Sequence, residues 1–171
     1  PKTLLPGCYF SSFWSDTALV FTNILSYLMQ NGKRSIAYFG ACNSETDNYN
    51  LSTLFSLYPA FDYTDIFYMT PDSIDDCFNE FFKARKKYDA VICTNDMVGV
   101  YLIERLKNND PEYFDKTFII SFMNSILSHV CHIPLTSCSH SNDIVPSVIH
   151  NMYRFLSKTK DLFAQQTISQ I

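Results

Sequence analysis

The sequence predicts a doubly wound α/β domain, in which helices cover both faces of a parallel sheet. Short apolar runs at 35–39, 65–69, 90–93 and 117–121 are typical of buried strands. Helical periodicity fills the segments between them, so strand and helix patterns alternate over 15–122. Because parallel strands need right-handed crossover connections, this alternation indicates successive βαβ units.

Each expected helix has its own boundary signals. Ser15 and Asp16 precede apolar residues at helical spacing, and Gly32 suits the position just past that helix end. A polar loop is expected at 41–48, followed by a short helix at 49–57.

The next two helices begin at polar residues that follow strands. Thr70 and Pro71 predict an N-cap and first helical position, with the helix running to about Lys86. The last helix of the alternation is expected at 96–107 and ends before the break at 108–111.

The alternation stops after Ser121. Residues 123–140 are expected to be irregular, apart from an extended piece at 135–138. Apolar spacing predicts a final helix over 142–156, and the segment 158–171 has no clear assignment.

Composition narrows the classes of function. The chain has 171 residues, 47% of them hydrophobic, and a net charge of -4, which indicates an ordered domain with a real core. Nucleic-acid binding by this chain is not indicated, because clustered Lys and Arg are lacking. The one basic run, at 83–87, is explained by a helix end, where it complements the helix dipole.

Cysteine use and the absence of long apolar segments indicate a cytoplasmic protein. The six cysteines form no CxxC pair, so we expect reduced thiols, with Cys93 acting as a small apolar residue inside a strand. Neither a signal peptide nor an apolar run of about 18 residues is present, and no membrane association is expected. Since the chain begins at Pro1 without Met, we expect a piece of a larger protein.

The most informative segment is the buried strand at 90–93 with the polar residues that follow it. In open α/β sheets, ligands bind at the carboxyl ends of the strands. Asn95 and Asp96 stand at that position and open a helix. Two interpretations stay open for them: an N-cap that accepts a backbone N–H bond, and a side chain that hydrogen-bonds a polar ligand.

Enzymatic chemistry is not indicated. The sequence has no GxSxG elbow and no carboxylate pair beside a His, and the acids expected at the strand ends of a response-regulator receiver are missing. The loop at 40–44 is neither a GxGxxG nor a Walker A loop. We expect no enzyme and no cofactor.

A zinc site is the less favoured interpretation of one cluster. Five potential ligands lie close together in the chain: His129, Cys131, His132, Cys138 and His140. Their spacing matches no common zinc signature, so a loop that happens to contain them is the favoured interpretation, with no metal.

Four segments resemble one family. Residues 33–40 (KRSIAYFG) resemble the strand "GHRRIAFIGG" of the lactose-repressor/galactose-repressor family of bacterial transcription regulators. Residues 88–96 (YDAVICTND) resemble its "PDAIFCAND", and residues 118–124 (FIISFMN) resemble its "ISVVGYDD". Residues 134–137 (PLTS) resemble its "PPLTT" at the same distance from the preceding strand.

The resemblance implies a periplasmic-binding-protein-like effector domain, most of it the C-terminal subdomain. That subdomain would cover 10–133. Residues 134–157 would cross back and supply a helix of the N-terminal subdomain, and 158–171 would be a tail of uncertain structure. The DNA-binding headpiece would lie outside this chain. The family's mechanism implies a homodimer, an effector between the subdomains, and DNA contact only through the headpiece.

The resemblance matches some residues of the family's effector site to this sequence and finds others replaced. Asn95 matches the asparagine that faces the sugar, and Asp96 matches its neighbour. The family's binding arginine falls near Asn50 or the next residue, and no Arg is present there. The effector-binding aspartate aligns with Met123, followed by Asn124. Two charged contacts to a sugar are therefore replaced, which implies a different, less polar ligand or the loss of small-molecule control.

Two alternatives use the same fold. The chain could be the sensor of another type of regulator, whose DNA-binding module follows the sensor. It could also be the solute-binding protein of a transporter, although six cysteines argue against an exported protein.

Overall fold

The computed structural model forms two compact units, which are described separately: Thr17–Ser139, and Pro1–Asp16 together with His140–Ile171. The structure describes residues 13–15, 17–42, 44–69, 73–84, 86–130, 133, 135–138, 149–150 and 166–168. The predicted domain boundaries at 10, 133 and 157 remain predictions.

The larger unit is built on a parallel sheet, as predicted, and this sheet has five strands. Its strands are β2 (Ile36–Ala41), β3 (Ile66–Tyr68), β4 (Ala90–Cys93), β5 (Phe118–Phe122) and β6 (Thr136–Cys138). They lie in the order β3-β2-β4-β5-β6, and every neighbouring pair is parallel. The chain moves from β2 outward to β3, then returns to place β4 on the other side of β2. This reversal makes the fold doubly wound.

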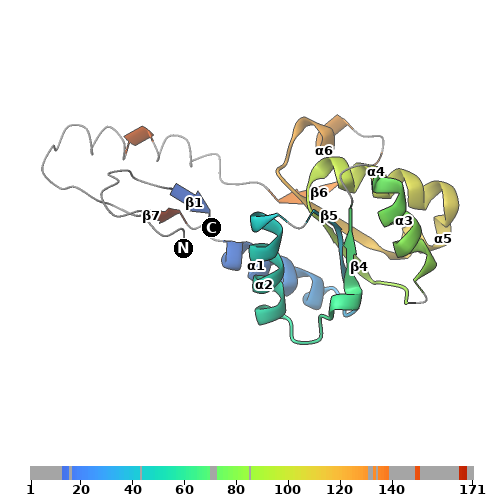
Figure 1. The fold of residues 1–171 in the computed structure, drawn as a ribbon. Coiled ribbons are helices and arrows are strands. Elements are labelled where there is room, and N and C mark those ends of the chain that lie inside the picture. Colours follow the sequence, from blue (N-terminus) through green and yellow to red (C-terminus); the bar gives the residue numbers. More distant parts are fainter. Residues whose placement is uncertain are drawn as a thin grey trace, which may run out of the picture. The chain divides into compact units, whose positions relative to one another are not determined.

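Helices cover both faces of this sheet (Figure 1). One face carries α1 (Thr17–Gln30) and α2 (Glu45–Leu57). The other carries α3 (Ile74–Lys83), α4 (Asp96–Asn109) and α5 (Pro111–Lys116). The short helix α6 (Ile126–Val130) follows β5.

The alternation of side chains along the strands explains these layers. In β2, Ile36 and Tyr38 pack with α1 and α2, whereas Ala37 and Phe39 pack with α3 and α4. All six residues of β2 and all four of β4 are buried. Continuous burial fits the unbroken apolar runs from which these strands were predicted, because both faces are covered.

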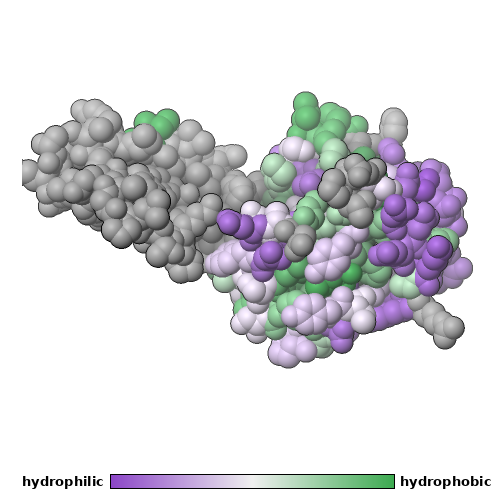
Figure 2. Space-filling model, viewed as in Figure 1, coloured by the Kyte–Doolittle hydropathy of each residue, from purple (hydrophilic) through white to green (hydrophobic). Residues whose placement is uncertain are grey.

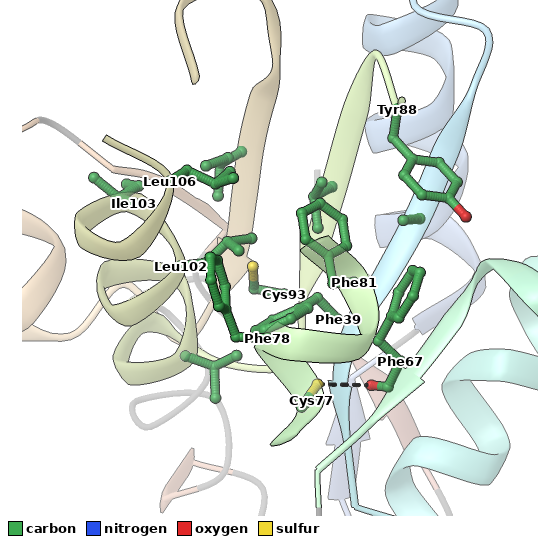
Figure 3. Packing of buried hydrophobic residues seen from close by; sticks show 14 of the residues in the cluster. Phe39, Phe67, Cys77, Phe78, Phe81, Tyr88, Cys93, Leu102, Ile103 and Leu106 are labelled. Carbon is green, nitrogen blue, oxygen red and sulfur yellow. Dashed lines mark hydrogen bonds between the residues drawn. The ribbon is translucent and has the colours of Figure 1, made fainter. Parts of the chain in front are cut away.

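Aromatic rings fill the core on the α3–α4 face (Figure 3). The ring of Phe81 lies edge-on to Phe39 at 5.5 Å and to Phe67 at 5.1 Å, measured between centroids. Cys93 is fully buried among these residues, as predicted for a cysteine that acts as an apolar side chain. These contacts anchor α3 to β2, β3 and β4.

Two helix starts were predicted wrongly. Helix α2 begins at Glu45, not near residue 49, because Ser44 is its N-cap and accepts a hydrogen bond from the Asp47 N–H. Helix α3 begins at Ile74 with Ser73 as N-cap, so the predicted cap at Thr70 is wrong. In both helices a serine in good capping geometry determines the start: Ser44 lies before the predicted start of α2, and Ser73 lies after the predicted cap of α3.

Two short helices were missed. Asp110 caps α5, and Pro111 occupies its first turn, although these residues were interpreted only as a chain break. Helix α6 lies inside the segment predicted to be irregular, whereas β6 confirms the predicted extended piece. A 3-10 turn, η1 (Tyr63–Asp65), precedes β3.

In the smaller unit, β1 (Phe13–Ser15) pairs in parallel with β7 (Gln166–Ile168). Strand β7 therefore lies in the segment that had no assignment from sequence. Most of the helix predicted at 142–156 lies outside the described residues, and Ile149 and His150 are helical. Among the described helices, none has the length and hydrophobicity to cross a bilayer.

Candidate functional site: the carboxyl edge of the sheet

The reversal of strand order puts a switch point between β2 and β4. At a switch point the loops after the two strands diverge to opposite faces, which opens a crevice at the carboxyl edge where open α/β sheets bind ligands. Here the described loop residues are Cys42 and Ser44 after β2, and Thr94 and Asn95 after β4. We call this part of the molecule the ligand edge.

Asp47 is the hub of the ligand edge on the β2 side. Asp47 is 3% exposed, and its Oδ1 accepts hydrogen bonds from the Thr94 hydroxyl (3.0 Å) and the Tyr38 hydroxyl (3.2 Å). Oδ2 accepts from the Cys42 N–H and the Ser44 hydroxyl, both at 2.9 Å. The carboxylate thus ties the loop after β2 to the end of β4, and all four donors are neutral.

Asn50 joins this hub through Tyr38. The Asn50 side chain hydrogen-bonds the Tyr38 hydroxyl. Burial, outweighing the hydrogen bonds from Asn50 and Thr94, raises the pKa of Tyr38 far above its ordinary value, so the phenol stays neutral. A role of Asn50 in binding a ligand stays a prediction.

Gly40 lets the end of β2 approach α4. Its φ is +83°, and a Cβ at this position would lie 2.6 Å from Cγ1 of Val98. Because Val98 is fully buried and β-branched, it has little freedom to move away. Glycine is therefore required to bring the loop after β2 and the start of α4 together.

Asn95 caps α4, which confirms one of its two interpretations. Its Oδ1 accepts a hydrogen bond of 3.0 Å from the Val98 N–H. The side chain is half-buried, and within the described part of the chain its amide nitrogen has no hydrogen-bond partner. The capping bond uses the amide oxygen and not the amide nitrogen. Contact of Asn95 with a ligand stays a prediction.

Asp96 hydrogen-bonds the elements on the β5 side of the ligand edge. The residue is 1% exposed, and its carboxylate accepts hydrogen bonds from the Ser121 hydroxyl (2.6 Å), the Ser137 hydroxyl (2.5 Å) and the Ser125 N–H (2.5 Å). Burial raises its pKa, but these hydrogen bonds outweigh burial and hold the pKa of Asp96 below its ordinary value. One carboxylate thus joins α4, β5, β6 and the start of α6.

Met123 and Asn124 form a turn with left-handed backbone immediately after β5. Their φ angles are 103° and 44°. Such a φ is unusual for Met and tolerated by Asn, so the surrounding structure must hold the turn in place. It does so through the Met123 N–H to the Cys138 carbonyl (2.9 Å) and the Asn124 N–H to the Ser137 hydroxyl (2.8 Å).

The five predicted site residues thus come from three neighbouring loops or helices at the carboxyl edge: Asn50 from α2, Asn95 and Asp96 from the start of α4, Met123 and Asn124 from the turn after β5. Sequence reasoning missed Asp47 and Tyr38, which organise this edge. A usable signal was present, because Tyr38 places a hydroxyl inside an otherwise apolar strand and requires a polar partner.

The residues of the suspected zinc cluster are only partly described. His129 is exposed on α6, and Cys138 lies on β6, whereas Cys131, His132 and His140 lie outside the described residues. Within the described residues, no three His, Cys, Asp or Glu side chains are grouped so as to hold a metal ion.

The comparisons with known proteins rest on structure. No family model matches the sequence, and no curated protein matches it. The transcriptional regulator CelR in complex with cellobiose superposes with a TM-score of 0.77 at 15% identity, over 96% of this chain and 53% of that chain. The Escherichia coli transcriptional repressor AscG gives 0.76 at 18% identity, over 92% of this chain and 60% of that chain.

A sugar-binding regulator of the LacI family from Escherichia coli, complexed with phosphate, gives a TM-score of 0.74 at 19% identity, over 92% of this chain and 59% of that chain. The chain thus spans between half and two thirds of the length of these regulators. The chain has the periplasmic-binding-protein-like fold of LacI-family transcriptional regulators.

Proposed function

We propose that this chain is the effector-sensing part of a bacterial transcription regulator of the LacI type. The observation that carries the proposal is the set of polar side chains at the switch point, in a fold shared with a sugar-binding transcriptional regulator of the LacI family. The groups at this edge cap helices and bind one another in fixed positions, which suits recognition of a ligand. The proposal is a binding role without catalysis.

The ligand is proposed to be a sugar or a related small molecule. The name of one similar structure includes cellobiose as its ligand. In this chain Asn50 and Asn95 offer amide groups, while Met123 is 65% exposed beside Asn124. An edge with amides and a thioether, without the family's arginine and aspartate, favours a ligand less polar than a simple hexose.

Regulation is proposed to be allosteric. A ligand held between this subdomain and a second one would change the angle between them, and with it the DNA affinity of an attached headpiece. This chain would touch DNA only through that headpiece, which agrees with its net charge of -4. Four described cysteines are free thiols, which supports a cytoplasmic location.

Self-association is proposed to use the apolar surface around α6. This surface consists of residues that are 41 to 73% exposed: Met97, Met123, Ile126, Leu127 and Val130. Figure 2 shows strongly hydrophobic surface over α6. Helix α6 packs against α4, which carries Met97 in its first turn, so these residues belong to neighbouring elements.

A second copy of the chain is the occupant that fits this surface. The sequence has no Asp, Glu, Lys or Arg from Thr117 to Asn142, which includes β5, α6 and β6. In a two-fold symmetric dimer each charge near the axis faces its own copy and is repelled. A neutral apolar surface avoids that repulsion, and exposed patches of this kind mark association sites.

Ligand binding is tested by thermal shift on the full-length regulator. Cellobiose, other mono- and disaccharides and nucleosides are added at millimolar concentration. A ligand that binds the folded state raises the melting temperature by mass action. The expected ligand stabilises the wild type, and the Asn95→Ala variant loses most of that shift. If no compound stabilises the wild type, the sensing function is contradicted.

Self-association is tested by sedimentation of the Ile126→Asp variant. A charge on each copy at the proposed axis should shift a dimer toward monomer. Tyr63→Asp is the control, because Tyr63 is 76% exposed on η1 and lies outside the α6 surface. If Ile126→Asp and Tyr63→Asp sediment alike, self-association through the α6 surface is contradicted.

A further inference from the structure

Three consecutive residues at the start of α4 have three different environments. Asn95 caps the helix at the ligand edge. Asp96 is buried, and Met97 is 59% exposed in the α6 surface. Asp96 therefore lies between a residue of the ligand edge and a residue of the α6 surface, at the start of one helix.

Asp96 holds the start of α6. Its Oδ2 accepts the Ser125 N–H at 2.5 Å, immediately before α6 begins at Ile126. Helix α6 has only five residues, too few to be stable by itself. Its place on the molecule therefore depends on its anchors to neighbouring elements, and the bond to a buried carboxylate is a strong one.

The same carboxylate also holds the turn at the ligand edge. The Ser137 hydroxyl donates to Oδ1 of Asp96 and accepts the Asn124 N–H at 2.8 Å. Asn124 has left-handed backbone and directly precedes Ser125. A displacement of this turn by a ligand would therefore act on the bonds that fix α6.

We propose that Asp96 is a positioning residue that links the ligand edge to self-association. This proposal rests on the proposed function, because it requires the α6 surface to join two copies of the chain. Asp96 and Ser137 hold α6 where its apolar side chains meet a second copy, and the Met123–Asn124 turn shares this anchor. A ligand at this edge acts on dimer affinity through Asp96.

The Asp96→Asn variant separates this role from a general loss of fold. Asparagine keeps the size of the side chain, and the N-cap of α4, Asn95, is unchanged. Its amide keeps one acceptor oxygen, so the serine hydroxyls and the Ser125 N–H compete for it. If the oxygen stays with the hydroxyls, the NH2 group faces the Ser125 N–H, and the anchor of α6 is lost.

The experiment is sedimentation equilibrium of the chain, well below its melting temperature, with dimer dissociation constants for each variant. Asp96→Asn is expected to raise the dissociation constant about tenfold or more, because a charge-assisted hydrogen bond is removed. Asp110→Asn is the control: Asp110 is the N-cap of α5 and accepts the Tyr113 N–H, and its replacement should leave the constant unchanged.

A double-mutant cycle with Ser137→Ala tests whether the two residues act as one unit. Ser137→Ala alone is the milder variant, and it should weaken the dimer without unfolding the chain. Combined with Asp96→Asn, it should add less than its effect in the wild type. Additive effects would overturn the linkage through Asp96.

The outcomes distinguish this proposal from the proposed function. If Ile126→Asp dissociates the dimer and neither Asp96→Asn nor Ser137→Ala changes its affinity, the α6 surface stands and the role of Asp96 is overturned. If Ile126→Asp has no effect, or the wild type is monomeric at every concentration, the self-association surface fails and the role of Asp96 fails with it.

Discussion

At the scale of single residues, Gly40 is the described glycine where an added Cβ would meet the closest contact. Gly40→Ala must place a Cβ 2.6 Å from the buried Val98 in a left-handed conformation. Left-handed backbone costs an L-residue roughly 1–2 kcal/mol, and overpacking adds about 1–3 kcal/mol. The expected loss of unfolding free energy is therefore about 2–5 kcal/mol, measured by urea denaturation.

Gly32 is the matched control for this prediction. It also has a positive φ, +73°, but a Cβ there would meet no atom within 4 Å. Gly32→Ala should therefore show the conformational cost alone, about 1–2 kcal/mol. Equal losses for the two variants would show that the approach of β2 to α4 is not tightly packed.

Asp89 should make the stability of the protein depend on pH in the acid range. The backbone N–H groups of Arg34 and Ser35 donate to its Oδ2 at 2.8 and 2.9 Å and hold the pKa of Asp89 below its ordinary value. Because the folded pKa is depressed, this contribution to stability is present above the unfolded pKa, about 3.9. It is lost as the pH falls through the lower folded pKa.

The prediction is that Asp89→Asn is less stable than the wild type at pH 6 and that the difference shrinks between pH 5 and pH 3. Urea denaturation midpoints at several pH values measure it. If the difference in stability between the variant and the wild type does not change with pH, the charge of Asp89 is not the source of its contribution to stability.

For single residues, the sequence predicted which positions lie at the ligand edge better than it predicted the hydrogen bonds that these residues make. Asn95 was identified because a polar residue follows a buried strand, and its capping role followed from general rules. Asp47 was missed because it lay in a segment interpreted as a loop, where an acid carries no information about burial. Its partners are Tyr38, which is nine residues away, and Thr94, which is 47 residues away. Pairings of this kind are decided by tertiary structure.

At the scale of elements, the N-cap of α2 determines where the ligand edge begins. Ser44 accepts the Asp47 N–H at 3.1 Å and donates to the Asp47 carboxylate at 2.9 Å. Ser44→Ala removes both bonds and should cost about 1–2 kcal/mol of unfolding free energy. Ser52→Ala, in the exposed face of the same helix, should change it by less than about 0.5 kcal/mol.

The elements differ in how far they could be predicted. The strands β2, β4 and β5 are continuous apolar runs and were found within a residue or two. Helices α5 and α6 are short, with six and five residues, and their apolar periodicity is too brief to detect. Helix α6 depends on Asp96 and on packing against α4, and neither is visible in its local sequence.

At the scale of the whole molecule, the basic side chains are unevenly distributed. The sequence has no Lys or Arg between Ser35 and Phe82, nor between Thr117 and Tyr153. The loops at the carboxyl edge lie in these two stretches or at Thr94–Asp96. The part of the ligand edge that this chain supplies therefore carries no Lys or Arg. The buried carboxylates Asp47 and Asp96 accept hydrogen bonds from neutral donors at the same edge.

This distribution predicts discrimination against anions. A phosphorylated sugar at this edge meets two carboxylates without a cation beside them, and like charges repel most strongly where water is excluded. In the full-length regulator, glucose 6-phosphate should therefore bind more weakly than glucose, by several-fold at low salt, and the difference should narrow as the salt concentration rises. Calorimetric titration at two salt concentrations measures both affinities. Tighter binding of the phosphorylated sugar would mean that cations from the facing subdomain dominate the field at the ligand edge.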